Sequence, residues 1–300
     1  MIKSILVTGC QGQLGRCLVR KLGGEAIGLT RSACDLTNRQ QVAEVVSALR
    51  PRIVINTAAY TNVDRAEEEA QSCHSVNVKG VEYLADACNQ VGARLFQVST
   101  DYVFGGDKQR DTPYCEEDRP APLGVYATSK LQGEIAAKAA TKHCIVRTCG
   151  LYDAPTDDYR PKNFCDTMIR LAAQHERIRV VDDQQCNPSY VPDVADAIIH
   201  LARLDENGIF HAVNGPPTTW FSLAKYLLSK VEPNVVVEPI TSEQFSSPVK
   251  RPSYSVLSTK KLDTCRGVPM RSWKNAVDEY LSRRSEQENS VSIDQKHVIA

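Results

Sequence analysis

The sequence predicts an α/β fold in which a doubly wound parallel sheet is followed by a smaller C-terminal part. Short β-branched runs alternate with longer helical patterns through the first half of the 300 residues, and a glycine-rich turn follows the first run. Beyond residue 150 the alternation loosens and prolines accumulate. Strands and helices that alternate in this way are typical of a parallel sheet covered by helices on both faces.

The first half supplies the expected strands and the helices that join them. Runs rich in Val, Ile and Leu predict buried strands at residues 4–8, 26–30, 53–56, 94–98 and 144–147. Apolar residues at helical spacing predict helices at residues 14–22, 42–49, 66–89 and 126–140. In the second half the same spacing predicts helices at residues 164–174, 193–204, 222–231 and 273–284.

These elements divide the chain into unequal parts. We expect residues 1–147 to form the sheet domain, with a return of the chain near residues 190–215. Residues 148–284 should mainly form the smaller part, which caps the carboxyl edge of the sheet, where open α/β folds bind their ligands. Residues 285–300 are polar without a clear pattern, so we expect them to form a flexible tail.

The bulk composition argues against several classes of protein. Lys and Arg total 36, as do Asp and Glu, so no net charge attracts nucleic acid or an anionic membrane surface. No apolar run approaches the ~18 residues that cross a bilayer, and no secretory signal precedes the first strand. The eleven cysteines form no CxxC pair, and the histidines show no metal-ligand spacing. We therefore expect a cytoplasmic protein with no metal ligand set and no nucleic-acid or membrane partner.

A glycine-rich motif, GxxGxxG, stands between the first predicted strand and the first helix. Glycine at these positions permits a tight turn, lets the backbone approach a pyrophosphate and lets the helix pack closely on the strand. The amides at the helix N-terminus then favour an anion. The motif predicts a Rossmann-type fold whose dinucleotide site includes Gly9, Gln11, Gly12, Gln13, Leu14 and Gly15. A tight turn that binds no ligand is the alternative.

The end of the second predicted strand bears on the choice of cofactor. Arg31 stands near the position where an acidic residue would bind the ribose 2′-hydroxyl of NAD, and a cation there accommodates the 2′-phosphate of NADP. The sequence therefore favours NADPH over NADH, with an ordinary solvated arginine as the alternative. Asp35 and Leu36 follow a few residues later and are expected beside the adenine ring.

Tyr126 and Lys130 are four residues apart on a predicted helix, so both side chains project from one face. Reducing a carbonyl requires a hydride and a proton, and a free tyrosine, with a pKa of about 10, exchanges its proton reluctantly at neutral pH. A lysine ammonium within ~4–6 Å would lower the phenol pKa by about 1–3 units. A plain surface pair is the alternative. The preceding strand ends in Ser99 and Thr100, whose hydroxyls should lie where a nicotinamide would bind.

These motifs resemble the extended short-chain dehydrogenase/reductase family, and more narrowly the dTDP-4-dehydrorhamnose reductase family. The resemblance extends in order from residue 1 to about residue 284, and its most specific run is Thr-Asp-Tyr-Val-Phe at residues 100–104. The narrower match rests on residues 56–67, 99–106, 122–126, 163–164, 181–184, 188–190 and 251–255.

The resemblance implies reduction, with NADPH or NADH, of the C4 keto group of a nucleotide-activated 6-deoxy sugar, taking dTDP-4-dehydrorhamnose to dTDP-rhamnose. Tyr126 would deliver the proton, Lys130 would orient it and hold the nicotinamide ribose, and Thr100 would hydrogen-bond the keto oxygen. The further cofactor contacts would be Ala58, Ala59, Tyr60 and Ser99. The substrate contacts would be Thr100, Asp101, Tyr102, Asn163 and Arg251.

Arg251 would face the substrate's pyrophosphate, for which a planar bidentate donor is suited, and a structural salt bridge is the alternative. Some members of the family place Mg²⁺ at a dimer contact, but no cluster in this sequence demands the ion, and a homodimer stays open. The family usually carries a tryptophan where this chain has Gly150, which implies a hole beside the sugar and leaves the exact sugar and base open. Trp220 is expected to be a packing residue.

Two other functions stay open at this point. One is a non-catalytic, cofactor-binding regulatory subunit that resembles that of methionine adenosyltransferase, because an intact Tyr–Lys pair does not exclude it. The other is a nucleotide-sugar epimerase or dehydratase, which would recycle a tightly held NAD. The run Thr100-Asp101-Tyr102 favours the reductase.

Overall fold

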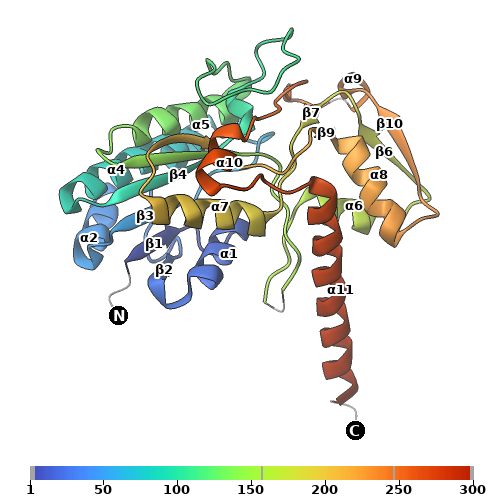
Figure 1. The fold of residues 1–300 in the computed structure, drawn as a ribbon, viewed down its shortest axis with the longest axis horizontal. Helices are drawn as coiled ribbons and strands as arrows, with labels where there is room; N and C mark the ends of the chain where they lie inside the picture. Colours follow the sequence, from blue (N-terminus) through green and yellow to red (C-terminus); the bar gives the residue numbers. More distant parts are fainter. Residues whose placement is uncertain (1–3, 157, 246, 298–300) are drawn as a thin grey trace.

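The computed structural model describes residues 4–156, 158–245 and 247–297, and its centre is a six-stranded sheet in the order β2-β1-β3-β4-β5-β8 (Figure 1). Every neighbouring pair in this sheet is parallel. The strands are β1 (Ile5–Thr8), β2 (Ala26–Leu29), β3 (Ile53–Asn56), β4 (Arg94–Thr100), β5 (His143–Thr148) and β8 (Gly208–His211). Since helices cover both faces, β1 and β3 are apolar runs with one polar residue at the end, and all four residues of each are buried.

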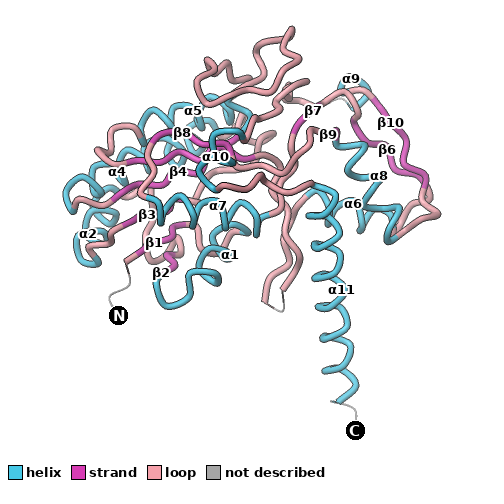
Figure 2. The backbone as a smooth tube through the Cα atoms, in the orientation of Figure 1, coloured by secondary structure: helices cyan, strands magenta, loops and turns pink. Residues whose placement is uncertain are grey.

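Two separate cores hold these helices against the sheet. On one face the core includes apolar residues of α1 (Gln13–Leu22), α7 (Val191–Leu204) and α10 (Lys260–Arg266). On the other face it includes residues of α2 (Arg39–Leu49), α4 (Gly80–Val91) and α5 (Gly124–Ala137). The chain reaches the last strand, β8, by passing back from the second half through α7 (Figure 2).

The smaller part lies beside the sheet, to the right in Figures 1 and 2. It has its own core, built mainly from α6 (Phe164–Ala172), α8 (Trp220–Val231) and α11 (Trp273–His297). Two short sheets complete it: the parallel pair β6 (Arg177–Val181) and β10 (Val236–Ile240), and the antiparallel pair β7 (Gln185–Cys186) and β9 (Thr218–Thr219). The short helix α9 (Ser242–Phe245) follows β10. Within the described ranges, no helix is both long enough and apolar enough to cross a bilayer.

The structure confirms the predicted doubly wound parallel sheet, and the five strands expected in the first half end within two residues of their predicted limits. The helix expected at residues 66–89 starts later, with α3 (Ala70–His74), and reaches α4 through a π-helical turn at Ser75–Lys79. Its first residues instead form turns, in which Glu67 accepts from the Val125 amide at the start of α5 and Glu69 accepts from the Tyr60 hydroxyl. Tertiary contacts therefore override the helical pattern there.

The interpretation of residues 285–300 as a patternless tail also differs from the structure, because α11 continues as a helix to His297. Residues 298–300 lie outside the described ranges. An apolar stripe is required only where a helix is buried. Glu and Gln, which recur in this segment, are good helix formers without such a stripe, so the helix continues past the end of its apolar pattern.

Arg94 on β4 fastens the end of α7 to the sheet. Its side chain is only 3% exposed, and it donates to the carbonyl oxygens of Ala202 at 2.6 Å and Glu206 at 3.0 Å. The guanidinium also lies over the Phe96 ring. A cation at the C-terminus of a helix satisfies carbonyl groups that have no partner within the helix and complements the helix dipole.

We predict that Arg94→Ala lowers the free energy of unfolding by about 3 kcal/mol, because it leaves buried carbonyl groups without donors. Urea denaturation measures the change. Arg39→Ala is the matched control, since Arg39 pairs with Asp86 on the surface and its side chain is 70% exposed. The control should cost less than about 1 kcal/mol. Equal losses in the two variants would contradict this account of Arg94.

Candidate active site

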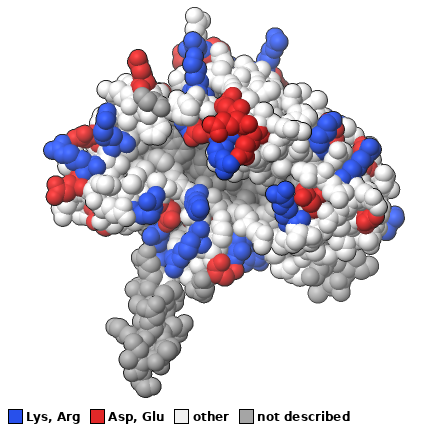
Figure 3. All heavy atoms as spheres, turned by 180° about the vertical axis from the view of Figure 1, so that it is seen from behind, with Lys and Arg blue, Asp and Glu red and all other residues white. Residues whose placement is uncertain are grey.

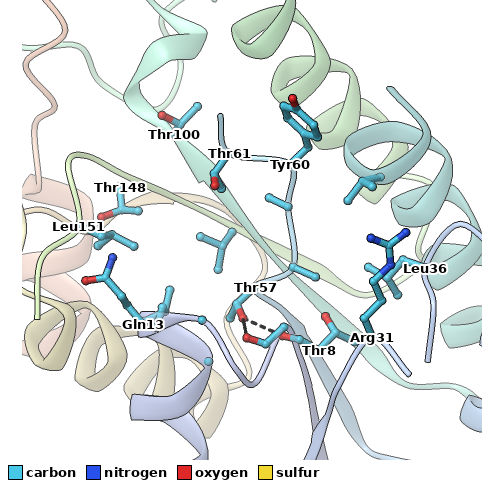
Figure 4. A pocket seen from close by; sticks show the side chains of 18 of the residues that line it. Thr8, Gln13, Arg31, Leu36, Thr57, Tyr60, Thr61, Thr100, Thr148 and Leu151 are labelled. Atoms are coloured by element: carbon cyan, nitrogen blue, oxygen red, sulfur yellow. Dashed lines mark hydrogen bonds between the residues drawn. The ribbon is translucent and has the colours of Figure 1, made fainter. Parts of the chain in front are cut away.

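A cavity of about 910 Å³ opens at the carboxyl ends of β1, β3, β4 and β5. This edge includes the point where the strand order reverses, since the chain runs from β1 outward to β2 and then back to β3. Figure 4 shows that Thr8, Thr57, Thr100 and Thr148 reach the cavity from four strand ends. The hydroxyl of Thr57 donates to the carbonyl oxygen of Thr8 at 2.7 Å and fixes two of these ends together.

The glycine-rich turn forms one wall of the cavity. Gly9 has a φ of 68°, and a Cβ atom at this position would lie 2.6 Å from the amide nitrogen of Ala58. At Gly15 a Cβ would collide with the carbonyl oxygen of Gly9. Helix α1 then begins without a side-chain cap at Gly12, so its N-terminal amides stay available to an anion.

Most predicted cofactor contacts line this same cavity. The residues from the turn and from the second strand end are Gly9, Gly12, Gln13, Leu14, Gly15, Arg31, Asp35 and Leu36. Those from the third and fourth strand ends are Ala58, Ala59, Tyr60 and Ser99, and the predicted substrate contact Thr100 lines the cavity too. Gln11 is exposed and does not line the cavity.

Helix α5 brings Tyr126 and Lys130 to the cavity beside Thr100. The phenol is half-buried and its ring meets the edge of the Tyr102 ring, and the neighbouring Thr100 hydroxyl donates to the Asp101 carboxylate at 3.1 Å. Burial, and secondly the Asp101 carboxylate, raise the pKa of Tyr126 above its ordinary value. The sequence predicted a lowered phenol pKa, and that prediction is wrong for this structure because desolvation is the largest effect on the phenol.

Lys130 is buried, and its ammonium donates to the carbonyl oxygen of Val98 at 2.7 Å. Burial lowers the pKa of Lys130 to about 8, and the Glu134 carboxylate opposes this shift. The lysine is therefore mainly charged at neutral pH and loses its charge in the mildly alkaline range.

Four predicted substrate contacts do not line the described cavity. Asp101 is buried and accepts a hydrogen bond from Ser255 at 2.6 Å. Asn163 caps the N-terminus of α6 by accepting from the Asp166 amide at 2.9 Å. The other two are Tyr102, which packs on Tyr126, and Arg251, which pairs with Asp64 at 3.0 Å.

The Arg251 ion pair is the structural alternative that the sequence analysis left open. The contact of Asn163 with the site is indirect, since its amide also donates to Gln13 at 3.3 Å. Tyr102 packs on the ring of Tyr126 and the Asp101 carboxylate acts on the Tyr126 phenol, but neither residue lines the cavity.

Sequence reasoning missed several residues that line the cavity. Arg160 and Lys162 reach it from the loop before α6, where the sequence contains no motif that predicts a site. Thr148 was missed too, and its buried hydroxyl has no hydrogen-bond partner among the described residues. Figure 3 shows the face opposite to that in Figure 1, with acidic side chains gathered above a hollow and Lys and Arg side chains below it.

The hole expected beside Gly150 is filled. A Cβ at Gly150 would lie 2.6 Å from Cη2 of Trp220, and Gly150 itself has a φ of 47°. The indole also packs against Phe164, with 4.7 Å between the ring centroids. An aromatic surface therefore stands beside Gly150, supplied by a residue 70 positions further along the chain.

The chain matches a family model described as the RmlD substrate binding domain over residues 3–286. A dTDP-4-dehydrorhamnose reductase from Mycobacterium tuberculosis is 39% identical over 301 residues, covering 97% of this chain and 96% of the relative. The chain belongs to the dTDP-4-dehydrorhamnose reductase family.

Solved structures agree with this assignment to the reductase family. A Bacillus anthracis dTDP-4-dehydrorhamnose reductase in complex with NADP is 37% identical, with a TM-score of 0.87 and coverage of 94% of this chain and 99% of that one. A Thermus thermophilus UDP-glucose 4-epimerase in complex with NAD has a TM-score of 0.76 at 22% identity, covering 94% and 99% of the two chains. At that identity the epimerase shows a shared fold alone.

We predict that Gly150→Ala destabilises this reductase by about 2 kcal/mol, because it forces a side chain into a left-handed conformation and against Trp220. Trp220→Leu removes the ring against which the new side chain would press. The double variant should therefore lose less stability than the sum of the losses in the two single variants. Urea denaturation of the four proteins measures the coupling.

The control for this cycle is Gly24→Ala, where a Cβ would have no atom within 4 Å. It should change the free energy of unfolding by no more than about 0.5 kcal/mol. Strict additivity of Gly150→Ala and Trp220→Leu would show that the indole does not occupy the space beside Gly150.

Proposed function

We propose that this protein reduces the C4 keto group of dTDP-4-dehydrorhamnose with NADPH, giving dTDP-rhamnose. The observation that carries the proposal is that Tyr126, Lys130 and Thr100 meet in the same cavity as the glycine-rich turn. The family relationship supports the choice of sugar nucleotide, since relatives at 39% identity bear the name of this reductase.

The residues present fit a dinucleotide cofactor. Gly9 leaves no room for a Cβ against the backbone of Ala58, so the turn packs tightly against the end of β3, and the buried Thr148 hydroxyl has no protein partner among the described residues. Arg31 is 80% exposed at the end of the second strand and lines the cavity, where its charge favours a 2′-phosphate. Bound NADPH supplies the hydride.

Tyr126 supplies the proton. Its raised pKa keeps the phenol neutral at physiological pH, which is the state required to donate to the keto oxygen. Thr100 lines the cavity beside the phenol, so its hydroxyl is close enough to hydrogen-bond the same oxygen once substrate binds. The Lys130 ammonium stabilises the phenolate left behind, because an opposite charge favours the ionised form.

The three proposed catalytic groups come from one chain, so this arrangement requires no second copy. Among the described residues, no group of three or more His, Cys, Asp or Glu side chains could hold a metal ion. Mg²⁺ and a homodimer are therefore not part of the proposal. All eleven cysteines are free, which suits the reducing cytoplasm in which we place the protein.

We predict that Tyr126→Phe lowers turnover by about 100-fold or more, because it removes the proton donor and keeps the ring. The measurement is the loss of absorbance at the nicotinamide band with NADPH and dTDP-4-dehydrorhamnose. Tyr83→Phe, on α4 and outside the cavity, is the control and should keep full activity. No NADPH consumption by wild-type protein that still binds the cofactor would refute the proposed reaction.

We predict that kcat/KM falls as the pH rises through about 8. The pKa of Lys130 lies at about 8 in the folded protein, against an ordinary 10.5, so the ammonium is present below this pH and lost above it. The phenol of Tyr126 has a raised pKa and stays protonated across this range. A rate that stays constant up to pH 9.5 would show that the charge of Lys130 is not needed.

A further inference from the structure

A buried ion pair joins α5, the helix that carries Tyr126 and Lys130, to the neighbouring strand β5. Glu134 and Arg147 have side chains that are 1% and 2% exposed. The pair is bidentate, with the guanidinium Nε and Nη2 atoms each 2.8 Å from a carboxylate oxygen. Burying two charges costs more than burying two apolar side chains of the same size, and the pair's attraction often only offsets that cost. Fold stability alone is therefore a weak explanation for this pair.

The pair joins α5 and β4, which carry the catalytic groups, to β5, which ends at the cavity. Glu134 belongs to α5, four residues after Lys130, so the two side chains share one face of the helix. Its carboxylate also accepts a hydrogen bond from Ser99 on β4 at 2.6 Å, next to Thr100. Arg147 belongs to β5 and immediately precedes Thr148, which lines the cavity.

On its other sides Arg147 meets neutral groups. Its guanidinium lies over the Phe104 ring and approaches Nε2 of His211 at 3.4 Å. Burial lowers the pKa of His211 to about 3, so this imidazole is neutral at working pH. Glu134 is therefore the charge that faces both Arg147 and the helix turn of Lys130.

The charged and titratable groups around Lys130 are few. Tyr126 shares its helix face, Cys73 approaches from α3, and Glu134 stands one turn further along α5. Burial raises the pKa of the Cys73 thiol, and the phenol of Tyr126 is also neutral at working pH. The carboxylate of Glu134 is the anion that acts on the ammonium.

We propose that Glu134, held in place by Arg147, is a positioning residue of the active site that keeps Lys130 charged and ties α5 to the strand end of Thr100. This role rests on the proposed function, since it deepens the part played by Lys130. Glu134 does not line the cavity, so it acts through Lys130 and Ser99 and not on a ligand.

The test uses two variants of the full chain. Glu134→Gln keeps the side-chain shape and an acceptor for Ser99 but removes the charge. It also leaves Arg147 unpaired, so it is paired with Glu134→Gln/Arg147→Met, which removes both charges. Arg94→Ala is the matched control for loss of a buried arginine that does not face Lys130.

Two readouts separate positioning from a merely structural role. The first is the titration of Lys130 in ligand-free protein, followed by NMR of ¹³C-labelled lysine with Lys130→Arg to assign the signal. We expect the Lys130 titration to move down by about one pH unit in both Glu134 variants, as loss of a nearby opposite charge requires, and not to move in Arg94→Ala. The second is the alkaline limb of kcat/KM, which should move with it.

An unshifted Lys130 titration in both Glu134 variants would overturn the proposal, even if both proteins lost thermal stability. The NMR readout needs no substrate turnover. A shifted titration in a protein that reduces no sugar nucleotide would therefore refute the proposed function and uphold the action of Glu134 on Lys130.

Discussion

The parallel register of the central sheet is the constraint on which the site depends. Because the strands run in one direction, their carboxyl ends lie at one edge, and hydroxyl residues far apart in sequence face one cavity. Thr8, Thr57, Thr100 and Thr148 each follow or end a buried strand, so each is placed by the core and not by its own loop. Side chains on such strand ends are held more rigidly than side chains on free loops.

The sequence was informative wherever function depends on local spacing. The glycine turn and the Tyr126–Lys130 pair could both be predicted, because three glycines around a helix start and two residues one turn apart fix their own geometry. Contacts between residues far apart in the sequence could not be predicted. No spacing revealed that Asp64 pairs with Arg251 across 187 residues, or that Trp220 fills the space beside Gly150. The prediction of a helix at residues 66–69 is wrong for the same reason, since Glu67 accepts a hydrogen bond from the amide of Val125, far away in the sequence.

Glu134 combines a spacing that the sequence shows with contacts that only the structure shows. Its spacing from Lys130 is visible in the sequence, and a carboxylate one helical turn from a lysine usually indicates a solvated surface pair. Its burial and its bidentate contact with Arg147 come from the packing of α5 against β4 and β5. The tyrosine and lysine motif therefore omits a carboxylate that opposes the effect of burial on the charge of Lys130.

The direction of the Tyr126 pKa shift bears on the proposed proton transfer. The spacing of Lys130 from Tyr126 predicts a lowered phenol pKa. In the folded protein, burial and the Asp101 carboxylate raise the pKa of Tyr126 instead. Abstracting a proton from a sugar hydroxyl, as oxidation of an alcohol requires, needs a phenolate, and a raised pKa opposes that form. Donating a proton to a keto oxygen needs the neutral phenol, which a raised pKa provides. The electrostatics of the cavity therefore hold Tyr126 in the protonation state that the proposed reduction needs.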